Sequence, residues 1–449
     1  LEADRLGRFF SRPVLARLAL IALLSTASAA QPPDRATRLD SALTAAHADG
    51  LFSGALVITA ADGDVMYRFA AGDLEGDPVT TDTPLYVASV TKAMTAAAAL
   101  SLAADGRLDL DAPVADVLEG WPYAVTARQL MDQTAGLHFL TMLTAERDTT
   151  RPVTTADLLA LVAQHAPGLV HEPGTAFDYD NANYATLAAV LETASGTPYA
   201  DVLRERVFEP AEMTTAFVAP SGELGWAAWS GGDGDGVWTS AEDLARFDDA
   251  FWNGRIIDLG VVDALTPPAL EGGALSTYAA GRFSTDTPRP LIGAFGDGGV
   301  TKAGLWRELE SRKAGEVNGA QPGTTYAMIA TDDGVYRTPV LTAAMAIWNG
   351  EPFALPLPRL TTDVPDRVLE RHVGVYESGM GRLHITLEDG QLHLEPEGAG
   401  GSEPLIAGSE TVFYFCCQDL TWEFVLDEAG RTVGLQIEGQ PQTLGTRVE

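Results

Sequence analysis

The spacing of hydrophobic and polar positions changes along this 449-residue chain: helix-like and strand-like segments alternate in the first part, and strand-like segments alone follow. Residues 36–49 carry a helix-like pattern, and residues 53–60 and 64–71 alternate like two strands around Ala61-Asp62-Gly63, which predicts a hairpin. Residues 93–104 are a run of good helix formers and predict a further helix. Because helix-like and strand-like segments keep mixing up to about Asn349, this part predicts an α/β domain.

The pattern changes after a stretch dotted with Pro352, Pro356 and Pro358, which is typical of a linker. Beyond it, apolar and polar residues alternate on both sides of turns at Asp389-Gly390 and Gly430, as in antiparallel hairpins. This alternation predicts an all-β domain, either a sandwich or a barrel. The chain therefore divides into a signal segment, a mixed domain, a linker and a β domain, at residues 1–29, 30–350, 351–366 and 367–449.

The first thirty residues have the layout of an export signal. Arg8, Arg12 and Arg17 precede an apolar stretch at residues 18–24, and Ala27-Ser28-Ala29 supplies the small residues of a cleavage site. The apolar stretch is short for a membrane span, and no cysteine follows it to carry a lipid. We expect an exported, periplasmic or extracellular protein without stable membrane insertion after cleavage, and an uncleaved anchor is the alternative.

Charge and composition exclude several classes of partner and cofactor. The 62 acidic residues exceed the 29 basic ones by 33, spread along the chain, which disfavours nucleic acid and anionic lipid as partners. The only cysteines, Cys416 and Cys417, are adjacent in a strand-like run where neighbouring side chains point to opposite faces, so we expect neither a disulfide nor a cysteine metal site. The seven histidines lack metal-ligand spacing and no nucleotide fingerprint occurs, so we expect no metal and no organic cofactor.

Lysine is rare in this chain, yet it recurs in short motifs. Two of only three lysines lie in Ser89-Val90-Thr91-Lys92 and Lys302-Ala303-Gly304. On a helix, a spacing of three places Lys92 one turn after Ser89 on the same face. A serine hydroxyl is a weak nucleophile until a neighbour takes its proton, and a desolvated neutral lysine can do so. An isolated S-x-x-K is more often an ordinary helix surface, so this motif needs support from elsewhere.

Two further motifs supply that support. Tyr179-Asp180-Asn181 follows the turn Pro173-Gly174, and its phenol could shuttle a proton while Asn181 could hydrogen-bond a substrate amide or ester. Lys302 follows Val300-Thr301 on what we expect to be the edge strand of a sheet, where its ammonium would attract a substrate carboxylate.

These three motifs, in this order and at these separations, resemble the serine β-lactamase and penicillin-binding protein superfamily, whose site is defined by S-x-x-K, Y-x-N and K-[ST]-G. The match is to the branch of class C β-lactamases, D-alanyl-D-alanine carboxypeptidases and family VIII esterases, and it covers about residues 35–348. Flanking segments agree: 85–89, 106–111, 134–137 and 239–244. The resemblance implies an α/β (α+β) β-lactamase/transpeptidase-like domain with an antiparallel sheet flanked by helices. The C-terminal domain resembles the lipocalin-like barrel often appended to these proteins.

The resemblance implies the catalytic roles. Ser89 would be the acylated nucleophile, Lys92 its general-base partner, and Tyr179 the group that passes protons to the leaving group. Whether Lys92 or Tyr179 is the base stays open, because coupled groups titrate as a set.

The resemblance also implies how the substrate is held. Asn181 and Lys302 would orient it. The oxyanion hole would consist of the backbone N–H groups of Ser89 and of Leu305, which directly follows Gly304.

Several positions depart from the family pattern. Asp180 adds a negative charge, Ala303 lacks the usual hydroxyl, and Glu308 stands where glycine is common, which together favour a neutral ester or amide over a β-lactam. The third motif also has a rival in Gly296-Asp297-Gly298-Gly299, which resembles the H-x-G version of esterases with an aspartate in the histidine position. We prefer Lys302, because aspartate cannot supply positive charge.

The sequence therefore predicts an exported serine hydrolase that cleaves a small ester, amide or peptide through a Ser89 acyl-enzyme. A D-alanyl-D-alanine carboxypeptidase and a β-lactamase acting on peptidoglycan-type substrates are the alternatives within this class. A penicillin-binding-like protein that binds a ligand without turnover is the alternative of another class, and the three departures at Asp180, Ala303 and Glu308 are its basis.

Overall fold

The computed structural model describes most of the chain from residue 34 onward. The described residues are 34–74, 76–137, 155–165, 168–219, 236–257, 265–268, 270, 277–285, 289–298, 301–310, 321–331, 337–353, 362–378, 381–388, 390–396, 403–415, 421–437 and 440–448. The expected export signal and cleavage site, the third lysine of the chain, Lys313, and the cysteine pair Cys416-Cys417 lie outside them. None of the helices that the structure describes is long and apolar enough to cross a membrane.

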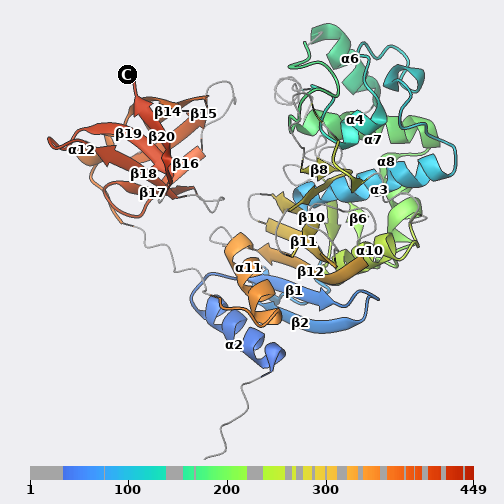
Figure 1. Cartoon of the computed structure of the whole chain (residues 1–449), viewed down its shortest axis with the longest axis horizontal. Helices are drawn as coiled ribbons and strands as arrows, with labels where there is room; N and C mark the ends of the chain where they lie inside the picture. Colours follow the sequence, from blue (N-terminus) through green and yellow to red (C-terminus); the bar gives the residue numbers. More distant parts are fainter. Residues whose placement is uncertain are drawn as a thin grey trace, which may run out of the picture.

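The first domain is built on a seven-stranded sheet with the order β2-β1-β12-β11-β10-β9-β8 (Figure 1). Each neighbouring pair runs antiparallel, which confirms the expected antiparallel sheet. The strands are β1 (Gly54–Thr59), β2 (Val65–Ala71), β8 (Tyr278–Ala279), β9 (Arg282–Ser284), β10 (Leu291–Asp297), β11 (Thr301–Glu310) and β12 (Gln321–Thr331). Short strands form two smaller sheets: β3 (Asp73–Leu74) with β4 (Asp77–Pro78), and β5 (Leu85–Tyr86), β7 (Val237–Thr239) and β6 (Phe217–Val218).

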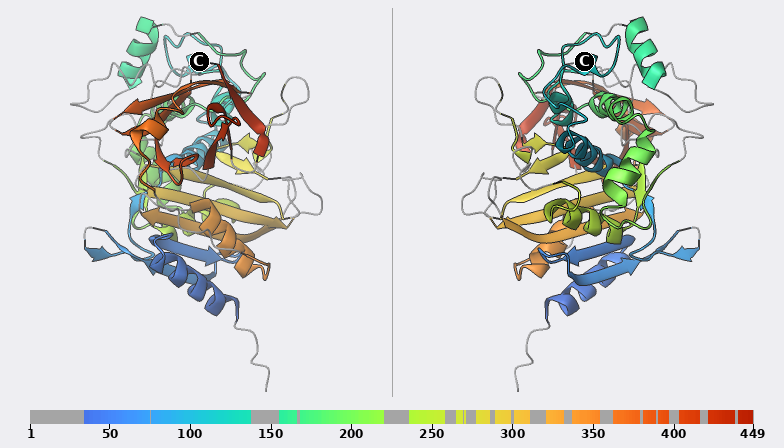
Figure 2. Two further views of the ribbon diagram at one scale, coloured as in Figure 1. Left: turned by 90° about the vertical axis from the view of Figure 1, so that its left-hand side faces the viewer. Right: turned by 90° about the vertical axis from the view of Figure 1, so that its right-hand side faces the viewer.

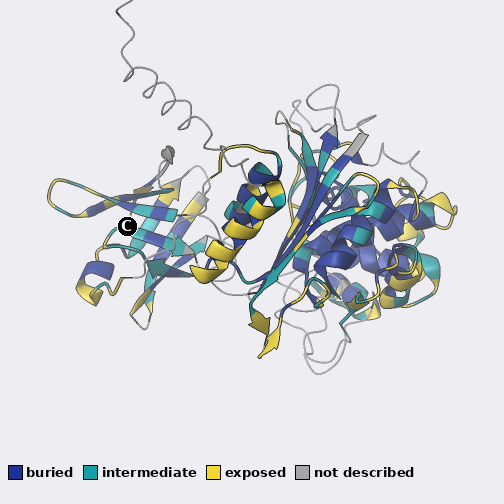
Figure 3. Ribbon diagram, turned by 90° about the horizontal axis from the view of Figure 1, so that it is seen from below, coloured by how far each residue is buried: buried dark blue, intermediate teal, exposed yellow. Residues whose placement is uncertain are grey.

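Strand alternation gives the sheet two apolar faces and therefore two cores. On β1, Ala55 and Val57 join the larger core, whereas Leu56 and Ile58 join the smaller one. Helices α2 (Arg35–Ala48) and α11 (Arg337–Trp348) cover the smaller core, and a mostly helical lobe covers the other face (Figure 2). The central strand β1 is accordingly buried along its whole length between the two layers of helices (Figure 3).

The helical lobe surrounds α3, which carries the predicted nucleophile motif at its start. Twelve of its fourteen residues are buried, because an alanine-rich helix that is apolar all round can pack on every side. The lobe's remaining helices are α4 (Ala127–Met131), α6 (Thr155–His165), α7 (Asn181–Ser195), α8 (Tyr199–Leu203) and α10 (Ala241–Trp252), with α3 itself at Thr91–Ala104. Short helical turns are η1 (Ala88–Val90), η2 (Val114–Asp116) and η3 (Arg204–Phe208).

The C-terminal domain is a closed eight-stranded barrel, which confirms the barrel rather than the sandwich. Each strand pairs with its neighbour in the sequence, and β13 pairs with β20 to close the sheet, so no edge remains. The strands, preceded by α12 (Asp366–Leu369), are β13 (Gly374–Ser378), β14 (Gly381–Glu388), β15 (Gln391–Pro396), β16 (Glu403–Ala407), β17 (Val412–Phe415), β18 (Thr421–Leu426), β19 (Thr432–Ile437) and β20 (Gln440–Arg447).

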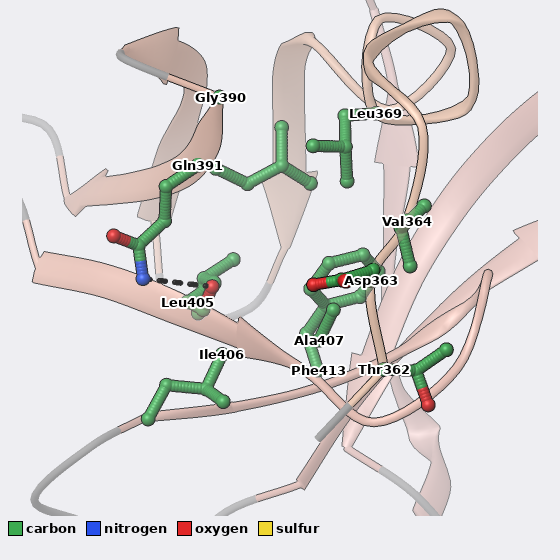
Figure 4. Close-up of a pocket in the computed structure, with 11 residues that line it drawn as sticks. Thr362, Asp363, Val364, Leu369, Gly390, Gln391, Leu405, Ile406, Ala407 and Phe413 are labelled. Carbon is green, nitrogen blue, oxygen red and sulfur yellow. Dashed lines mark hydrogen bonds between the residues drawn. The ribbon is translucent and has the colours of Figure 1, made fainter.

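A pocket with a volume of about 480 Å³ opens in this barrel domain (Figure 4). Val364, Leu405 and Phe413 are among the residues that line it, and Gln391 donates to the Leu405 carbonyl at 3.5 Å beside it. Thr362, which we assigned to the linker, donates from its backbone to Ala407 at 2.9 Å. The last residues of the expected linker therefore belong physically to the barrel domain.

Candidate active site

Ser89 and Lys92 are in direct contact at the start of α3. The Lys92 Nζ donates to Ser89 Oγ at 3.0 Å, as the helical spacing predicts. The Lys92 side chain is only 1% exposed. Since water is excluded from this amine, the serine hydroxyl is a principal polar neighbour, and the pair has the geometry of a nucleophile and its proton acceptor.

Backbone strain is concentrated around this pair. Four non-glycine residues in the described segments have positive φ, and three of them are Ala88 at 45°, Gln133 at 57° and Ala280 at 45°. Ala88 directly precedes Ser89, and each such conformation costs about 1–3 kcal/mol unless the surroundings enforce it. Beside Ala280, Gly281 packs so tightly that an added Cβ would lie 2.6 Å from the Lys92 carbonyl oxygen.

Tyr179 lies next to the lysine. Its ring centroid is 5.3 Å from Lys92 Nζ, and its side chain is 38% exposed, so the phenol is reachable from both the lysine and solvent. Asn181 begins α7, and its Oδ1 is a buried acceptor with no hydrogen bond from another described group. The structure therefore brings Ser89, Lys92 and Tyr179 together and places Asn181 two residues beyond the tyrosine.

Asp132 and Gln133, which directly precede the Thr134–Leu137 segment, make hydrogen bonds to the chain on both sides of the site. The Gln133 side chain accepts from Asn183 Nδ2 at 2.6 Å and from the Asp180 N–H at 3.2 Å. Asp132 accepts from the Ala280 N–H at 3.0 Å, so it ties the helical lobe to the β8–β9 turn. Burial raises the pKa of Asp132 to about 7, although the Ala280 hydrogen bond and Arg128 oppose the shift.

The strand beside the nucleophile is β10. A Cβ added at Gly296 of β10 would lie 2.1 Å from the Val87 carbonyl oxygen and 3.0 Å from the Ser89 nitrogen. Only glycine allows this close approach, so Gly296 fixes the distance between the sheet and η1. The expectation that Lys302 lies on an edge strand was wrong, because β11 is flanked by β10 and β12.

This topology argues against two of the expected substrate-binding roles. Leu305 pairs with Ala294 on one side and Ala327 on the other, in the middle of the sheet, so its N–H is used by the sheet ladder rather than directed at an oxyanion. Gly304 faces away from η1, since an added Cβ would lie 2.9 Å from Leu341 of α11.

Lys302 shares the face of Gly304 and is only 2% exposed. Its ammonium forms an ion pair with Asp297, directly opposite on β10. Lys302 and Asp297, the key residues of the two alternative third motifs, therefore form an ion pair with each other. Such a pair leaves little net positive charge to attract a substrate carboxylate.

The three departures from the family pattern also have structural explanations. Asp180 caps α7 by accepting from the Ala182 N–H at 2.6 Å, so its charge is directed at the helix terminus. Glu308 accepts from Tyr326 Oη at 3.2 Å on the α11 side of the sheet. Ala303 is buried in the central strand β11. These contacts give no support to the inference that the three residues select the substrate directly.

The sequence matches the family described as Beta-lactamase over residues 39–334. The chain belongs to this family.

Two relatives of known name illustrate the range of the β-lactamase family. Penicillin-binding protein 4* of Bacillus subtilis (strain 168) is 26% identical over 415 residues, which cover 83% of this chain and 90% of that protein. Esterase EstB of Burkholderia gladioli is 33% identical over 216 residues, which cover 41% of this chain and 54% of the esterase. The octameric penicillin-binding protein homologue from Pyrococcus abyssi has the same fold, with a TM-score of 0.56 and 19% identity over 91% of this chain and 99% of that one.

Family membership makes the chain a member of a hydrolase superfamily, and the fold shows which residues the motif search missed. Asp132 and Gln133 directly precede the quoted Thr134–Leu137 segment, and their adjacency to it was the available signal. Phe283 of β9 carries no motif, and its ring stacks on that of Tyr179 with centroids 6.5 Å apart. No cluster of metal-ligating side chains occurs among the residues with described positions.

Proposed function

We propose that the protein is an exported serine hydrolase that cleaves a neutral ester or amide through a Ser89 acyl-enzyme. The observation that carries this proposal is the 3.0 Å hydrogen bond between Lys92 Nζ and Ser89 Oγ in a buried setting. Membership of the β-lactamase family supports the reaction class.

Each residue has a chemical step. Lys92 accepts the Ser89 proton as Oγ bonds to the substrate carbonyl carbon. The backbone N–H of Ser89 donates to the oxyanion that forms. Tyr179, beside Lys92, passes the proton to the leaving group as the ester or amide bond breaks. A water molecule then attacks the acyl-enzyme, which releases the carboxylic acid and restores Ser89.

The charges near the site favour neutral substrates. Asp297 occupies the third-motif position at the end of β10, and Lys302 compensates it. Neither residue therefore presents the uncompensated cation that a carboxylate-bearing β-lactam or peptide would require. The similarity to Esterase EstB of Burkholderia gladioli supports an ester as one substrate class.

Export is part of the proposal. It rests on the basic, apolar and small-residue order of residues 1–29. Expression of the chain in a bacterium, followed by N-terminal sequencing of the periplasmic fraction, should give a new terminus near Ala30. Full-length protein retained in the membrane would support the uncleaved anchor instead.

The acyl-enzyme is tested by a quenched reaction with p-nitrophenyl acetate, read by peptide mass spectrometry. We expect an acetyl group on the Ser89 peptide, absent in Ser89→Ala and strongly reduced in Lys92→Ala. Ser101→Ala is the matched control, because Ser101 is a buried serine on α3, the helix that carries Lys92. Lys302→Met tests whether Lys302 lies outside the reacting centre. Because this lysine is paired with Asp297 on the face of the sheet away from η1, its replacement should leave acetylation of Ser89 intact.

Absence of an adduct in folded protein would favour the binding protein without turnover. If the adduct forms, a panel of neutral esters, D-alanyl-D-alanine peptides and β-lactams ranks the alternatives. Faster turnover of the carboxylate-bearing substrates would contradict the neutral-substrate proposal.

A further inference from the structure

The chain on both sides of Tyr179 is hydrogen-bonded to one residue, Gln133. The Asp178 N–H donates to the Gln133 backbone carbonyl at 2.9 Å, and the Asp180 N–H donates to Gln133 Oε1 at 3.2 Å. Asp180 is in extended conformation, with φ −141° and ψ 140°. In extended backbone the N–H groups of alternate residues point to the same side, so a single residue can reach both. The two hydrogen bonds therefore fix the backbone directly before and after the tyrosine.

Gln133 is itself held in one conformation. It is fully buried, and its φ of 57° lies in the left-handed region, which residues other than glycine rarely adopt. Its Oε1 also accepts from Asn183 Nδ2 at 2.6 Å, and the same amide donates to the Asp180 carbonyl at 3.2 Å. A buried polar network of this kind rigidifies its members. Both acceptors of Gln133 are therefore held toward the chain around Tyr179.

The residue before Gln133 in the chain supports the rings that pack on the tyrosine. Asp132 accepts from the Ala280 N–H at 3.0 Å. Ala280 lies in the turn between Tyr278 and Phe283. The ring of Tyr278 contacts that of Tyr179 edge-on at 5.9 Å, and Phe283 stacks on it at 6.5 Å. Two adjacent residues therefore hold the backbone of the tyrosine and the partners of its ring.

Tyr179 depends on this support, because its own ring is only partly enclosed. The side chain is 38% exposed, so packing restrains it on one side alone. Its ring centroid lies 5.3 Å from Lys92 Nζ. A proton carrier must stay within hydrogen-bond reach of the groups it serves, and a displacement of about 1 Å lowers a rate by about 10²-fold.

We propose that Gln133 is a positioning residue of the reaction. By fixing the backbone on both sides of Tyr179, it keeps the phenol where a proton can pass from Lys92 to the leaving group. Gln133 is buried and acts only through the tyrosine. This inference rests on the proposed Ser89 acyl-enzyme.

The test compares two esters that form the same acetyl-enzyme. Ethyl acetate needs a proton on its departing ethoxide, whereas p-nitrophenyl acetate does not, so the ratio of their kcat/KM values reports the proton transfer. Gln133→Met keeps the length of the side chain and removes its acceptor. We expect the ratio to fall about 10²-fold, with kcat/KM for p-nitrophenyl acetate changed less than about threefold. An equal loss for both esters would overturn the inference, because a general defect in the fold does not depend on the leaving group.

A double variant separates positioning of the tyrosine from any other effect. In a Tyr179→Phe background, Gln133→Met should change the ratio less than about twofold, because no phenol remains to be positioned. A further loss as large as in the wild-type background would contradict the proposal.

Tyr184→Phe is the matched control. Tyr184 Oη donates to the Met131 carbonyl at 2.8 Å, so the variant removes one buried hydrogen bond between α7 and the chain next to Asp132. It retains the ring and leaves the contacts of Gln133 intact, so it should lose stability in urea and keep the ratio. A fall in the ratio as large as in Gln133→Met would refute a specific role for Gln133.

Should Gln133→Met fail to fold, Asn183→Ala removes the donor that orients the Gln133 side chain. Alanine is a good helix former, and Asn183 lies within α7. The ratio should fall about tenfold in this variant, and an unchanged ratio would overturn the inference.

The two proposals fail separately. An acetyl adduct on Ser89 with an unchanged ratio in Gln133→Met refutes the positioning role alone. Wild-type turnover of p-nitrophenyl acetate without turnover of ethyl acetate has the same meaning, because the leaving group then receives no proton. No adduct in folded protein refutes the proposed function.

Discussion

The close approach of Gly296 to η1 gives a sharp test of which strand positions the nucleophile. In Gly296→Ala the new methyl would lie 2.1 Å from the Val87 carbonyl oxygen, where about 3.2 Å is needed, so backbone must move by roughly 1 Å. Overpacking of this kind costs about 1–3 kcal/mol of stability. A displacement of about 1 Å at a nucleophile lowers the rate of reaction by about 10²-fold.

A second glycine on the same strand supplies the control for this prediction. A Cβ at Gly293 would also lie 2.1 Å from a backbone oxygen, that of Leu305, but this contact is within the sheet. Gly168→Ala is a neutral control, because nothing lies within 4 Å of its Cβ position.

The assay pairs urea unfolding with the rate of Ser89 acetylation by p-nitrophenyl acetate. We expect both β10 variants to lose similar stability, and only Gly296→Ala to lose about 10²-fold in acetylation rate. Equal acetylation rates in the two variants would refute the reasoning that β10 sets the position of Ser89.

Three further perturbations test single groups. Burial raises the pKa of Asp132 to about 7 from 3.8, so the wild type holds a proton that the unfolded chain loses. Its stability relative to Asp132→Asn should fall as the pH rises from about 4 to about 7, by up to about 4 kcal/mol in urea unfolding, and a flat difference would contradict this. Desolvation instead lowers the pKa of His372 in the barrel, so the wild type should lose stability relative to His372→Gln as the pH falls below 6.5, measured in the same way. Tyr179→Phe keeps the ring but removes the proton carrier, so kcat should fall about 10²- to 10⁴-fold for an amide and much less for a p-nitrophenyl ester, whose leaving group needs no proton; equal losses would exclude this role.

Local patterns predicted the elements of this protein well. The helix-like segment at 36–49 is α2, the alternating pair is β1 and β2 around Gly63, and the alanine-rich run is α3. Each of these features depends on residues close in the sequence, such as the Asp34 side chain that caps α2 by accepting from the Thr37 N–H at 2.9 Å. The hairpins of the barrel were predictable for the same reason.

The position of the third motif was not predictable in this way. Lys302 and Asp297 are five residues apart, and their sequence alone does not say which strand lies beside Ser89. That order depends on the pairing of β10, β11 and β12, whose contacts span tens of residues. The stack of Tyr179 on Phe283 has the same character, because the fold brings together two rings that are far apart in the sequence.

The balance between a hydrolase and a binding protein without turnover changes once these contacts are known. The binding alternative rested on Asp180, Ala303 and Glu308, and the structure gives each of them a role outside the reacting centre. Meanwhile, strained backbone at Ala88, Gln133 and Ala280 surrounds the Ser89–Lys92 contact. Strained backbone is found at ligand clamps as well as at active sites. Only catalysis, however, depends on fixing a serine hydroxyl against its proton acceptor. The direct contact between Ser89 and the buried Lys92 therefore favours turnover.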